Sequence, residues 1–297
     1  MTHSQGFHAD DVVAYAILKE VLTKQGEAWE IVRTRDLEII KTGDIVFDVG
    51  GEYNPTQNRY DHHQEGRAGS RDNGVLYASV GLIWKHFGRD LCSSDRVWDE
   101  IDRNLIQELD AIDNGQNYIG QLMFKDSGYT SLSIHIANFK PLALGKKDAN
   151  DLLNAFEEVS EFARGILRRM IDNEEFFEHA FFEVSEIYKN TTDKHILIFN
   201  KDYGRPTWKR LSEYPEPMFA VYYNDKYDDW RVESIPVTPI TFEARKLAPE
   251  SWRGLSNQEL QDATGVSDAK FCHPSGFLIG VKSFEGAMEL AKKALLM

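Results

Sequence analysis

The first 115 residues alternate between stretches of helical and of extended hydrophobic periodicity. Residues 11–24 place apolar side chains three or four positions apart, which predicts a helix with Asp10 as its N-cap and Gly26 as the residue that ends it. Further helices are predicted at about 75–87 and at about 94–113, each followed closely by a glycine.

Two short β-rich runs, residues 30–35 and 44–49, lie between the predicted helices, and the second is bounded by Gly50 and Gly51. Alternating helices and strands indicate an α/β domain with an open, mostly parallel sheet. In such sheets ligands bind at the carboxyl ends of the strands, so the residues that directly follow each strand are candidates for a site.

A different pattern begins after residue 148. Residues 149–189 contain no proline and keep an apolar stripe at helical spacing, which predicts one long helix or two in tandem. Next come three β-rich runs (195–200, 219–223 and 230–237), a loop-like stretch (236–249) and a closing helix near 284–296. We therefore expect a first domain at 1–189, which includes the long helix, and a second, smaller α+β domain at 190–297.

The composition is that of a folded, acidic protein of 297 residues, 42% of them hydrophobic, with a formal net charge of −14. No run approaches the ~20 apolar residues that span a bilayer, and the first residues lack the features of a signal peptide, so we expect a cytoplasmic protein without membrane contact. Cys92 and Cys272 are too few for a disulfide scaffold or a four-cysteine zinc site. Any metal must then be held by histidines and carboxylates.

The acidic excess is concentrated in the first 120 residues, which carry 21 acids and 12 bases. The sequence has no block of Lys and Arg, which argues against a protein that wraps long duplex DNA. A buried carboxylate cluster that needs cations would produce the same bias.

Histidine and aspartate cluster in this N-terminal part, where four of the nine histidines fall within the first 63 residues. The candidate ligands are His3, His8 and Asp10 in the opening segment, Asp48 after an apolar strand, His62 and His63 beside Asp61, and Asp110 and Asp113 at a helix end. Imidazole and carboxylate together suit Mn²⁺, Zn²⁺ or Fe²⁺.

Two features of this set favour a centre with two cations. The adjacent His62 and His63 cannot point the same way in extended backbone, so one can be a ligand while the other faces substrate. A carboxylate such as Asp48 can bridge two cations roughly 3.5–4 Å apart, the spacing of two-metal phosphoryl chemistry. Such cations lower the pKa of a bound water from near 15.7 to about 7, which supplies hydroxide at neutral pH.

Each residue also has a simpler interpretation. Asp10 can be a plain helix cap, and Asp48 can start the Gly-Gly turn. Asp110 and Asp113 can belong to a solvated helix face, and the two adjacent histidines can be a structural pair. The joint occurrence of these residues, in order and on alternating α/β elements, favours the metal centre.

Residues 2–11, 46–51, 59–64 and 110–115 resemble the motifs of the MYG1 family, also called UPF0160, a branch of the DHH phosphoesterases. The resemblance continues through residues 249–255 and 271–277 and so covers nearly the whole chain. It implies hydrolysis of phosphodiester or phosphoanhydride bonds with two Mn²⁺ or Mg²⁺ ions, in an α/β domain joined to a smaller substrate-clamping domain. Members are described as 3′–5′ exonucleases acting on RNA, and older labels called them metal-dependent protein hydrolases.

The resemblance also implies roles for single residues. By position, His3, His8 and Asp48 hold one ion, and Asp10, Asp48, His62 and one of Asp110 and Asp113, with Asp113 favoured, hold the other. His63 would contact the scissile phosphate or protonate the leaving oxygen, and Asp61 would orient His62. Other DHH branches have aspartate in place of His8, and the extra imidazole shifts the metal preference from Mg²⁺ toward Mn²⁺ or another transition metal.

Substrate anchoring needs further cations. Arg33 and Arg35 belong to the first β-rich run, and Arg245 and Arg253 lie in the second domain; arginine binds phosphate through its fork and stacks on bases. The same arginines can instead be surface ion-pair partners. By the resemblance, the segment with His273 and Ser275 stands in place of the glycine-histidine motif of other DHH branches.

The sequence therefore predicts a two-domain, metal-dependent hydrolase, with the terminal linkage of short single-stranded RNA as its expected substrate. One alternative is a small-molecule phosphohydrolase acting on pyrophosphate, a cyclic dinucleotide or a phosphonucleotide. The other is a metal-stabilised binding protein without catalysis. Metal identity, cleavage polarity and oligomeric state, a homodimer included, are left open.

Overall fold

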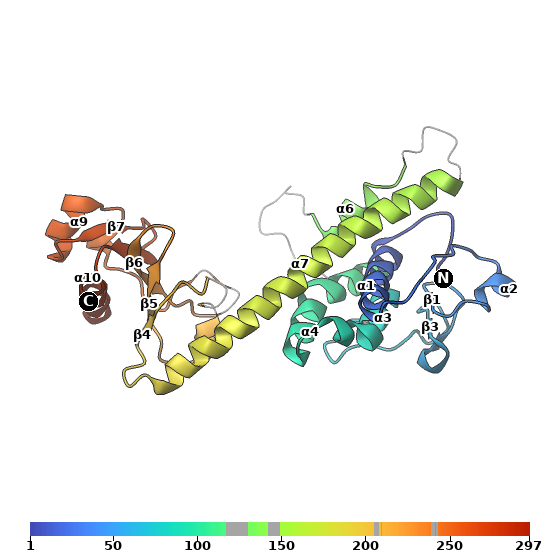
Figure 1. Ribbon diagram of the computed structural model, residues 1–297, viewed down its shortest axis with the longest axis horizontal. Coiled ribbons are helices and arrows are strands. Elements are labelled where there is room, and N and C mark those ends of the chain that lie inside the picture. The colour runs from blue at the N-terminus through green and yellow to red at the C-terminus, as the bar shows by residue number, and fades with distance from the viewer. Residues whose placement is uncertain (117–129, 142–148, 205–207, 209, 239–240, 242) are drawn as a thin grey trace. The chain divides into compact units, whose positions relative to one another are not determined.

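The computed structural model describes residues 1–297 except 117–129, 142–148, 205–207, 209, 239–240 and 242 (Figure 1). The chain divides into two compact units, Met1–Glu175 and Phe176–Met297. The division falls inside α7 (Ala149–Asn190), a single helix of 42 residues. One long helix is thus found where one or two were predicted. The units divide inside this helix, between Glu175 and Phe176, whereas the prediction places the boundary near residue 190, at its end.

The first unit is built around α1, in which every residue from Asp10 to Lys19 is buried. Its helices are α1 (Ala9–Gln25), α2 (Leu37–Ile40), α3 (Ser79–Phe87), α4 (Asp95–Ile101), a π-helical segment (Asp102–Ile106), α5 (Gln107–Asp113), α6 (Leu132–Ala137) and the first part of α7, with 3₁₀ turns at Pro55–Gln57 and Gly88–Leu91. Apolar side chains of α1, α3, α5 and α7 form one core. The helix predicted at 94–113 is present, interrupted by the π-helical segment.

The start of α1 differs from the prediction, in which Asp10 is the N-cap. The N-cap is His8, whose backbone N–H donates to the Asp11 carboxylate at 2.6 Å. Asp10 lies inside the first turn, and this frees its carboxylate to contact another helix. The C-terminal end is as predicted, because Gly26 adopts the left-handed conformation with φ 74°.

The sheet of the first unit is short. Its strands are β1 (Val46–Phe47), β2 (Tyr53–Asn54) and β3 (Arg59–Tyr60), in the order β1-β3-β2, with β1 and β3 parallel and β2 and β3 antiparallel. The run predicted as a strand at 30–35 contributes a single parallel bridge between Arg33 and Thr2.

Backbone hydrogen bonds place the N-terminus between these segments. Thr2 N–H donates to Val32 O at 3.1 Å, and Phe47 N–H donates to Met1 O at 3.0 Å. The first residues therefore act as a terminal strand, and they bring the side chains that follow it beside those that follow β1. This is the edge at which ligands bind in α/β folds.

The second unit contains a five-stranded sheet in the order β4-β5-β6-β8-β7, in which only β4 and β5 are parallel. Its elements are β4 (Ile196–Phe199), β5 (Phe219–Asn224), β6 (Asp229–Ser234), β7 (Ala269–Cys272), β8 (Leu278–Val281), α9 (Asn257–Thr264) and α10 (Phe284–Leu296), with 3₁₀ turns at Leu211–Glu213 and Glu250–Trp252. The mixed α/β class and the closing helix are confirmed, whereas α9, β7 and β8 were not predicted. No helix in the described parts of the chain is long and apolar enough to cross a membrane.

Candidate metal centre

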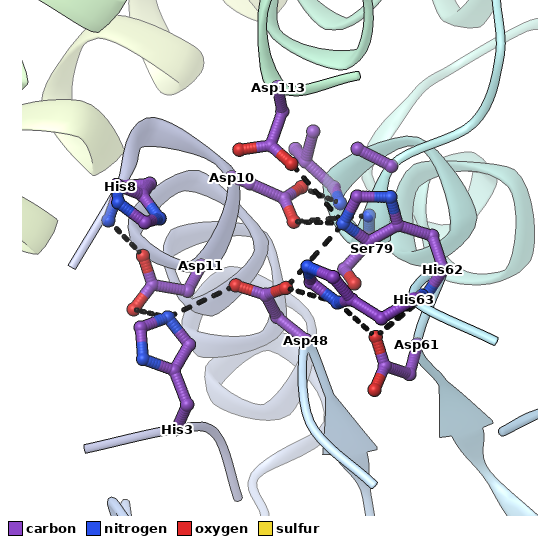
Figure 2. Close-up of polar contacts among 12 residues, drawn as sticks. His3, His8, Asp10, Asp11, Asp48, Asp61, His62, His63, Ser79 and Asp113 are labelled. Carbon is purple, nitrogen blue, oxygen red and sulfur yellow. Dashed lines mark hydrogen bonds and ion pairs between the residues drawn. The ribbon is translucent and has the colours of Figure 1, made fainter. Parts of the chain in front are cut away.

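Histidine and aspartate side chains converge at the start of α1 and after β1 and β3 (Figure 2). They form three overlapping groups, namely His3, Asp11 and Asp48; Asp10, His62 and Asp113; and Asp48, Asp61, His62 and His63. Within each group the candidate ligand atoms all lie within 4.8 Å of one another. Segments up to 110 residues apart in the sequence thus build one site.

Asp48 joins the groups. One of its oxygens, Oδ2, lies 3.2 Å from His3 Nε2, and the other, Oδ1, lies 3.7 Å from His62 Nε2. Asp48 directly follows β1 in the left-handed conformation, with φ 54°, which aspartate tolerates better than most residues. This turn directs a carboxylate between two imidazoles, the arrangement that a bridging ligand needs.

Asp10 and Asp113 complete the group around His62. The Nε2 atom of His62 lies 3.2 Å from Asp113 Oδ2 and 3.8 Å from Asp10 Oδ2. The carboxylate of Asp10 is buried and accepts the backbone N–H groups of Ser79, at 3.2 Å, and Val80, at 2.5 Å, at the start of α3. The partial positive charge of a helix N-terminus favours an ionised carboxylate there.

Asp110, the other candidate on α5, faces away from this group. Its buried carboxylate accepts from Arg71 Nη1 at 2.6 Å and from the backbone N–H groups of Ala78 and Gly81 at 2.8 and 3.0 Å. Among the described residues it belongs to none of the groups that could hold a metal. The geometry therefore assigns Asp110 to the support of α3 and brings only Asp113 to His62.

Asp61 contacts a different histidine ring from the one expected. Its Oδ1 accepts from the backbone N–H groups of His62 and His63, at 2.7 and 3.1 Å, and lies 2.7 Å from His63 Nδ1. The Asp61 contact raises the pKa of His63. The side chain of His63 is 60% exposed, and its contacts with Asp61 and Asp48 are made by Nδ1.

The ring of His62 is oriented by Asn114, a residue that sequence reasoning did not identify as functional. Asn114 Nδ2 donates to Asp110 O at 2.9 Å, and Asn114 Oδ1, which accepts from Arg67 Nη1 at 3.1 Å, lies 3.4 Å from His62 Nδ1. When a cation is bound, a proton on Nδ1 would leave the lone pair of Nε2 free to act as a ligand. The one signal in the sequence is the position of Asn114 directly after Asp113.

Asp11 is the second residue that the sequence analysis missed as a ligand. It is fully buried, and its Oδ2 lies 3.4 Å from His3 Nε2 and 3.4 Å from Arg33 Nη2. His8, by contrast, is exposed and belongs to none of the candidate metal groups of the described residues, although its ring centroid is 5.9 Å from that of His3. The adjacency of Asp11 to Asp10 could have suggested it.

The two N-terminal arginines lie in different surroundings. The guanidinium of Arg33 is buried, donates to Gly6 O and to Asp11, and stacks 4.1 Å from the ring centroid of Phe156. Arg35 is exposed, with Nη2 3.3 Å from His3 Nδ1, and lines a cavity of about 330 Å³. The cavity is also lined by His3, His8, Asp48, Val49, Gly50, Asp61, His63 and Asp113.

The remaining substrate candidates belong to the second unit. Arg245 donates to three backbone carbonyls, those of Ser212 and Tyr214, both at 2.6 Å, and of Pro217 at 3.1 Å. Its guanidinium thus fixes a loop of its own unit.

Arg253, His273 and Ser275 also make contacts within that unit. Arg253 Nε donates to Ala248 O at 2.9 Å, and the backbone N–H of Ser275 donates to His273 Nδ1 at 3.1 Å. Arg253 lines a different cavity, beside Lys246 and Ser251.

The negative charges of the carboxylates in the candidate centre favour the binding of cations. Burial raises the pKa of Asp10, and the charges of Asp48 and Asp113 raise it further. Burial lowers the pKa of His62, but the carboxylates of Asp113, Asp48 and Asp10 outweigh it and raise that pKa to about 11. A proton on His62 thus partly offsets the negative charge that a divalent cation would offset more fully.

The residues present fit divalent cations. Asp48 Oδ1 and His62 Nε2 are buried and make no hydrogen bond with any described residue, although such atoms are rarely left unpaired. The separations of 3.2–3.8 Å between imidazole and carboxylate atoms are close to the roughly 3 Å between neighbouring ligands around a cation bound at about 2.1 Å. Nitrogen and oxygen donors together suit Mn²⁺, Zn²⁺ or Fe²⁺.

Fold and site together define a mixed α/β protein with a buried histidine–aspartate centre suited to divalent cations. Residues 1–295 match the MYG1 family, described as "Uncharacterised protein family (UPF0160)", and the chain belongs to this family. The resemblance drawn from the motifs is thereby confirmed.

Named relatives cover nearly the whole chain. The mouse and human proteins named "MYG1 exonuclease" are each 30% identical over 99% of this chain and over 84% and 85% of their own lengths. The fission yeast protein "MYG1 protein C694.04c" is 30% identical over 99% of this chain and 96% of its own length. The predicted hydrolase class agrees with the names of the mammalian relatives.

Two solved structures are also similar to this chain. A pGpG-specific phosphodiesterase, PggH from Vibrio cholerae, is 13% identical with a TM-score of 0.30, over 99% of this chain and 96% of its own. RecJ from Thermus thermophilus, solved in complex with Mn²⁺, is 13% identical with a TM-score of 0.29, over 100% of this chain and 52% of its own.

Proposed function

We propose that the chain is a divalent-metal-dependent phosphoesterase that removes nucleotides from the 3′ end of short single-stranded RNA. The observation that carries the proposal is the position of Asp48 between two histidine–aspartate groups, with one oxygen toward His3 and the other toward His62. Two carboxylate-bridged cations are the usual device for in-line displacement at phosphorus. The name of the mouse and human relatives supports an exonuclease, and the motif resemblance supports RNA and the 3′–5′ direction.

The residues divide into ligands and groups that act on substrate. His3, Asp11 and Asp48 would hold one cation, and Asp48, Asp10, His62 and Asp113 the other. When bound, the cations would polarise a phosphoryl oxygen and activate water. Mn²⁺ is the metal we expect, because the ligand set mixes imidazole with carboxylate.

His63 and Arg35 are the groups that act on the substrate itself. Asp61 holds the ring of His63 through Nδ1, so Nε2 can protonate the oxygen that leaves. Arg35 lies in the same cavity and supplies positive charge for the phosphate.

The test is hydrolysis by the full-length protein loaded with Mn²⁺. Oligoribonucleotides labelled at the 5′ or the 3′ end, the matching DNA, pyrophosphate and a cyclic dinucleotide are compared at fixed salt. We expect stepwise shortening of the 5′-labelled RNA and early release of the label from the 3′-labelled RNA. No turnover of any phosphoester would make the chain a metal-stabilised binding protein, and turnover of the small molecules alone would make it a small-molecule phosphohydrolase.

His62→Ala tests the site. It removes the imidazole shared by two of the groups, so we expect metal-dependent turnover to be lost while the circular dichroism spectrum is kept. The matched control is His195→Ala, because His195 is an exposed histidine of the second unit whose ring contacts Asp193. Undiminished hydrolysis by His62→Ala would disprove the assignment of the centre.

A further inference from the structure

A second cavity lies beside the candidate metal centre. Its volume is about 320 Å³, within the ~300–1,000 Å³ of small-molecule sites. It is formed by the start of α1, the end of α5, α6 and Lys140. His8 and Asp113 line both this cavity and the one that contains Arg35 and His63. A phosphate held at the metal centre would therefore adjoin both cavities.

The two cavities differ in chemistry. Leu109, Ile112 and Ala137 give the second cavity an apolar wall, and Arg35 and His63 place a guanidinium and an imidazole in the first. A phosphodiester carries one substituent on each side of the phosphorus, and the apolar wall of the second cavity offers a surface for the face of a base.

Two polar side chains in the second cavity are uncommitted. The hydroxyl oxygen of Ser133 is buried and makes no hydrogen bond within the described part of the chain. Lys140 forms no ion pair with the residues that the structure describes, and its Nζ lies 5.7 Å from the ring centroid of Phe7. A buried hydroxyl without a partner is costly and indicates a ligand group that would satisfy it.

We propose that this cavity is the subsite for the nucleoside on one side of the cleaved phosphate. The apolar wall contacts the base, the Ser133 hydroxyl hydrogen-bonds to the sugar, and Lys140 contacts a phosphate oxygen at the mouth. The inference rests on the proposed function as far as cleavage is concerned, but nucleotide binding can be measured without turnover. It names a nucleotide, rather than pyrophosphate, as the substrate class.

The experiment measures binding of adenosine 5′-monophosphate, adenosine and inorganic phosphate to the full-length, Mn²⁺-loaded protein by titration calorimetry. Ala137→Trp fills the cavity from an exposed position at the end of α6, and Lys140→Gln removes its cation. The matched control is Ile134→Trp, which places the same side chain at an exposed position of α6 that does not line the cavity.

We expect Ala137→Trp to weaken binding of the nucleotide and of adenosine at least tenfold and to leave that of phosphate unchanged. Lys140→Gln should weaken binding of the nucleotide about tenfold, which is the effect of losing one charge-assisted hydrogen bond. It should leave binding of adenosine unchanged. Ile134→Trp should match the wild type, and Mn²⁺ affinity should be equal in all variants, because none of these residues belongs to a metal group.

Wild-type nucleotide affinity in Ala137→Trp, or nucleotide binding no tighter than that of phosphate in the wild type, would overturn the subsite. The two proposals fail separately. Absence of phosphoester turnover with cavity-dependent nucleotide binding would reject the proposed function and keep the subsite. Turnover of RNA with an unchanged KM in Ala137→Trp would reject the subsite and keep the proposed function.

Discussion

Two aspartates of α5, three residues apart, have different tasks. Asp110 is fully buried and pairs with Arg71, whereas the side chain of Asp113 is 20% exposed and faces His62. Both are acids at the same helix end, so their types and spacing do not separate them. Their partners distinguish them, because Arg71 contacts Asp110 but not Asp113, and His62 contacts Asp113 but not Asp110.

The pair can be separated by comparing Asp110→Asn with Asp113→Asn. Asp110→Asn should lower the free energy of unfolding by about 2 kcal/mol, because it removes the charge that faces a buried guanidinium. Asp113→Asn should change stability by less than about 1 kcal/mol, because its side chain is partly exposed, but should weaken Mn²⁺ binding at least tenfold. Urea unfolding and calorimetric Mn²⁺ titration measure the two effects, and the opposite pattern would exchange the two roles.

Asn114 should act on the metal through His62. Asn114→Ala removes the oxygen that faces Nδ1 of the ring, so we expect Mn²⁺ affinity to fall about tenfold or more, as is typical when the partner of a metal-binding histidine is lost. Asn114→Asp keeps an acceptor and should restore most of the affinity. Equal Mn²⁺ affinity in Asn114→Ala and wild type would contradict this role, and Asn138→Ala, at an exposed position after α6, is the control.

Residue types and order singled out His3, Asp10, Asp48 and His62, which the structure brings together. They could not choose between Asp110 and Asp113, because the deciding partner of Asp110, Arg71, lies 39 residues away. Asp11 and Asn114 were missed for a related reason. Each stands beside a stronger candidate, and only the folded chain shows which atoms their side chains face.

At the scale of elements, α3 receives its N-terminal caps from other helices. Its N-cap is Ala78, which has no side-chain oxygen, and the first backbone N–H groups are accepted by Asp10 of α1 and Asp110 of α5. The helix predicted from about residue 75 begins at Ser79, because local signals cannot reveal caps that come from distant segments. One helix end thus holds a candidate metal ligand and a structural aspartate together.

The close approach of α5 to α3 predicts an unusual effect of Gly81→Ala. In an exposed helix position, alanine stabilises relative to glycine by up to about 1 kcal/mol. At Gly81 the new Cβ would overlap the carboxylate of Asp110, so we expect a loss of about 1–3 kcal/mol instead. Urea unfolding of the full-length protein measures the change.

Gly165→Ala is the matched control, because Gly165 also lies inside a helix of the first unit, and its new Cβ would meet nothing closer than Arg169 Nη1 at 3.7 Å. That variant should be as stable as the wild type or up to about 1 kcal/mol more stable. If Gly81→Ala behaved in the same way, the packing of Asp110 against α3 would be wrong.

The sheets show where the sequence pattern was insufficient. Strands β4, β5 and β6 were found because each has a clear β-rich run, and α10 because it has a regular apolar stripe. In the first unit the extended segments pair over only two residues each, too few for a period of two to appear. β7 and β8 were missed because a turn containing Pro274 and Gly276 lies between two runs of four residues.

At the scale of the whole molecule, the candidate ligands all belong to one of two compact units. The first unit has its own core around α1. In the second unit, apolar clusters pack against the five-stranded sheet of that same unit. Every described group that could hold a metal lies between His3 and Asp113. Metal binding should therefore be linked to the stability of the first unit alone.

Hydrogen exchange of the full-length protein, resolved by peptide, tests this linkage. A ligand that binds only the folded state at 100 times its dissociation constant stabilises that state by about 2.7 kcal/mol, which slows exchange through global opening roughly 100-fold. We expect such slowing for the slowest amides of α1, α3 and α5 on addition of Mn²⁺, its reversal by a chelator, and no change in strands β4 to β8. His62→Ala should abolish the effect, because it removes a ligand from two of the three groups. Equal protection of both units would mean that they unfold as one cooperative body through α7, and absence of protection in the first unit would contradict metal binding at the centre.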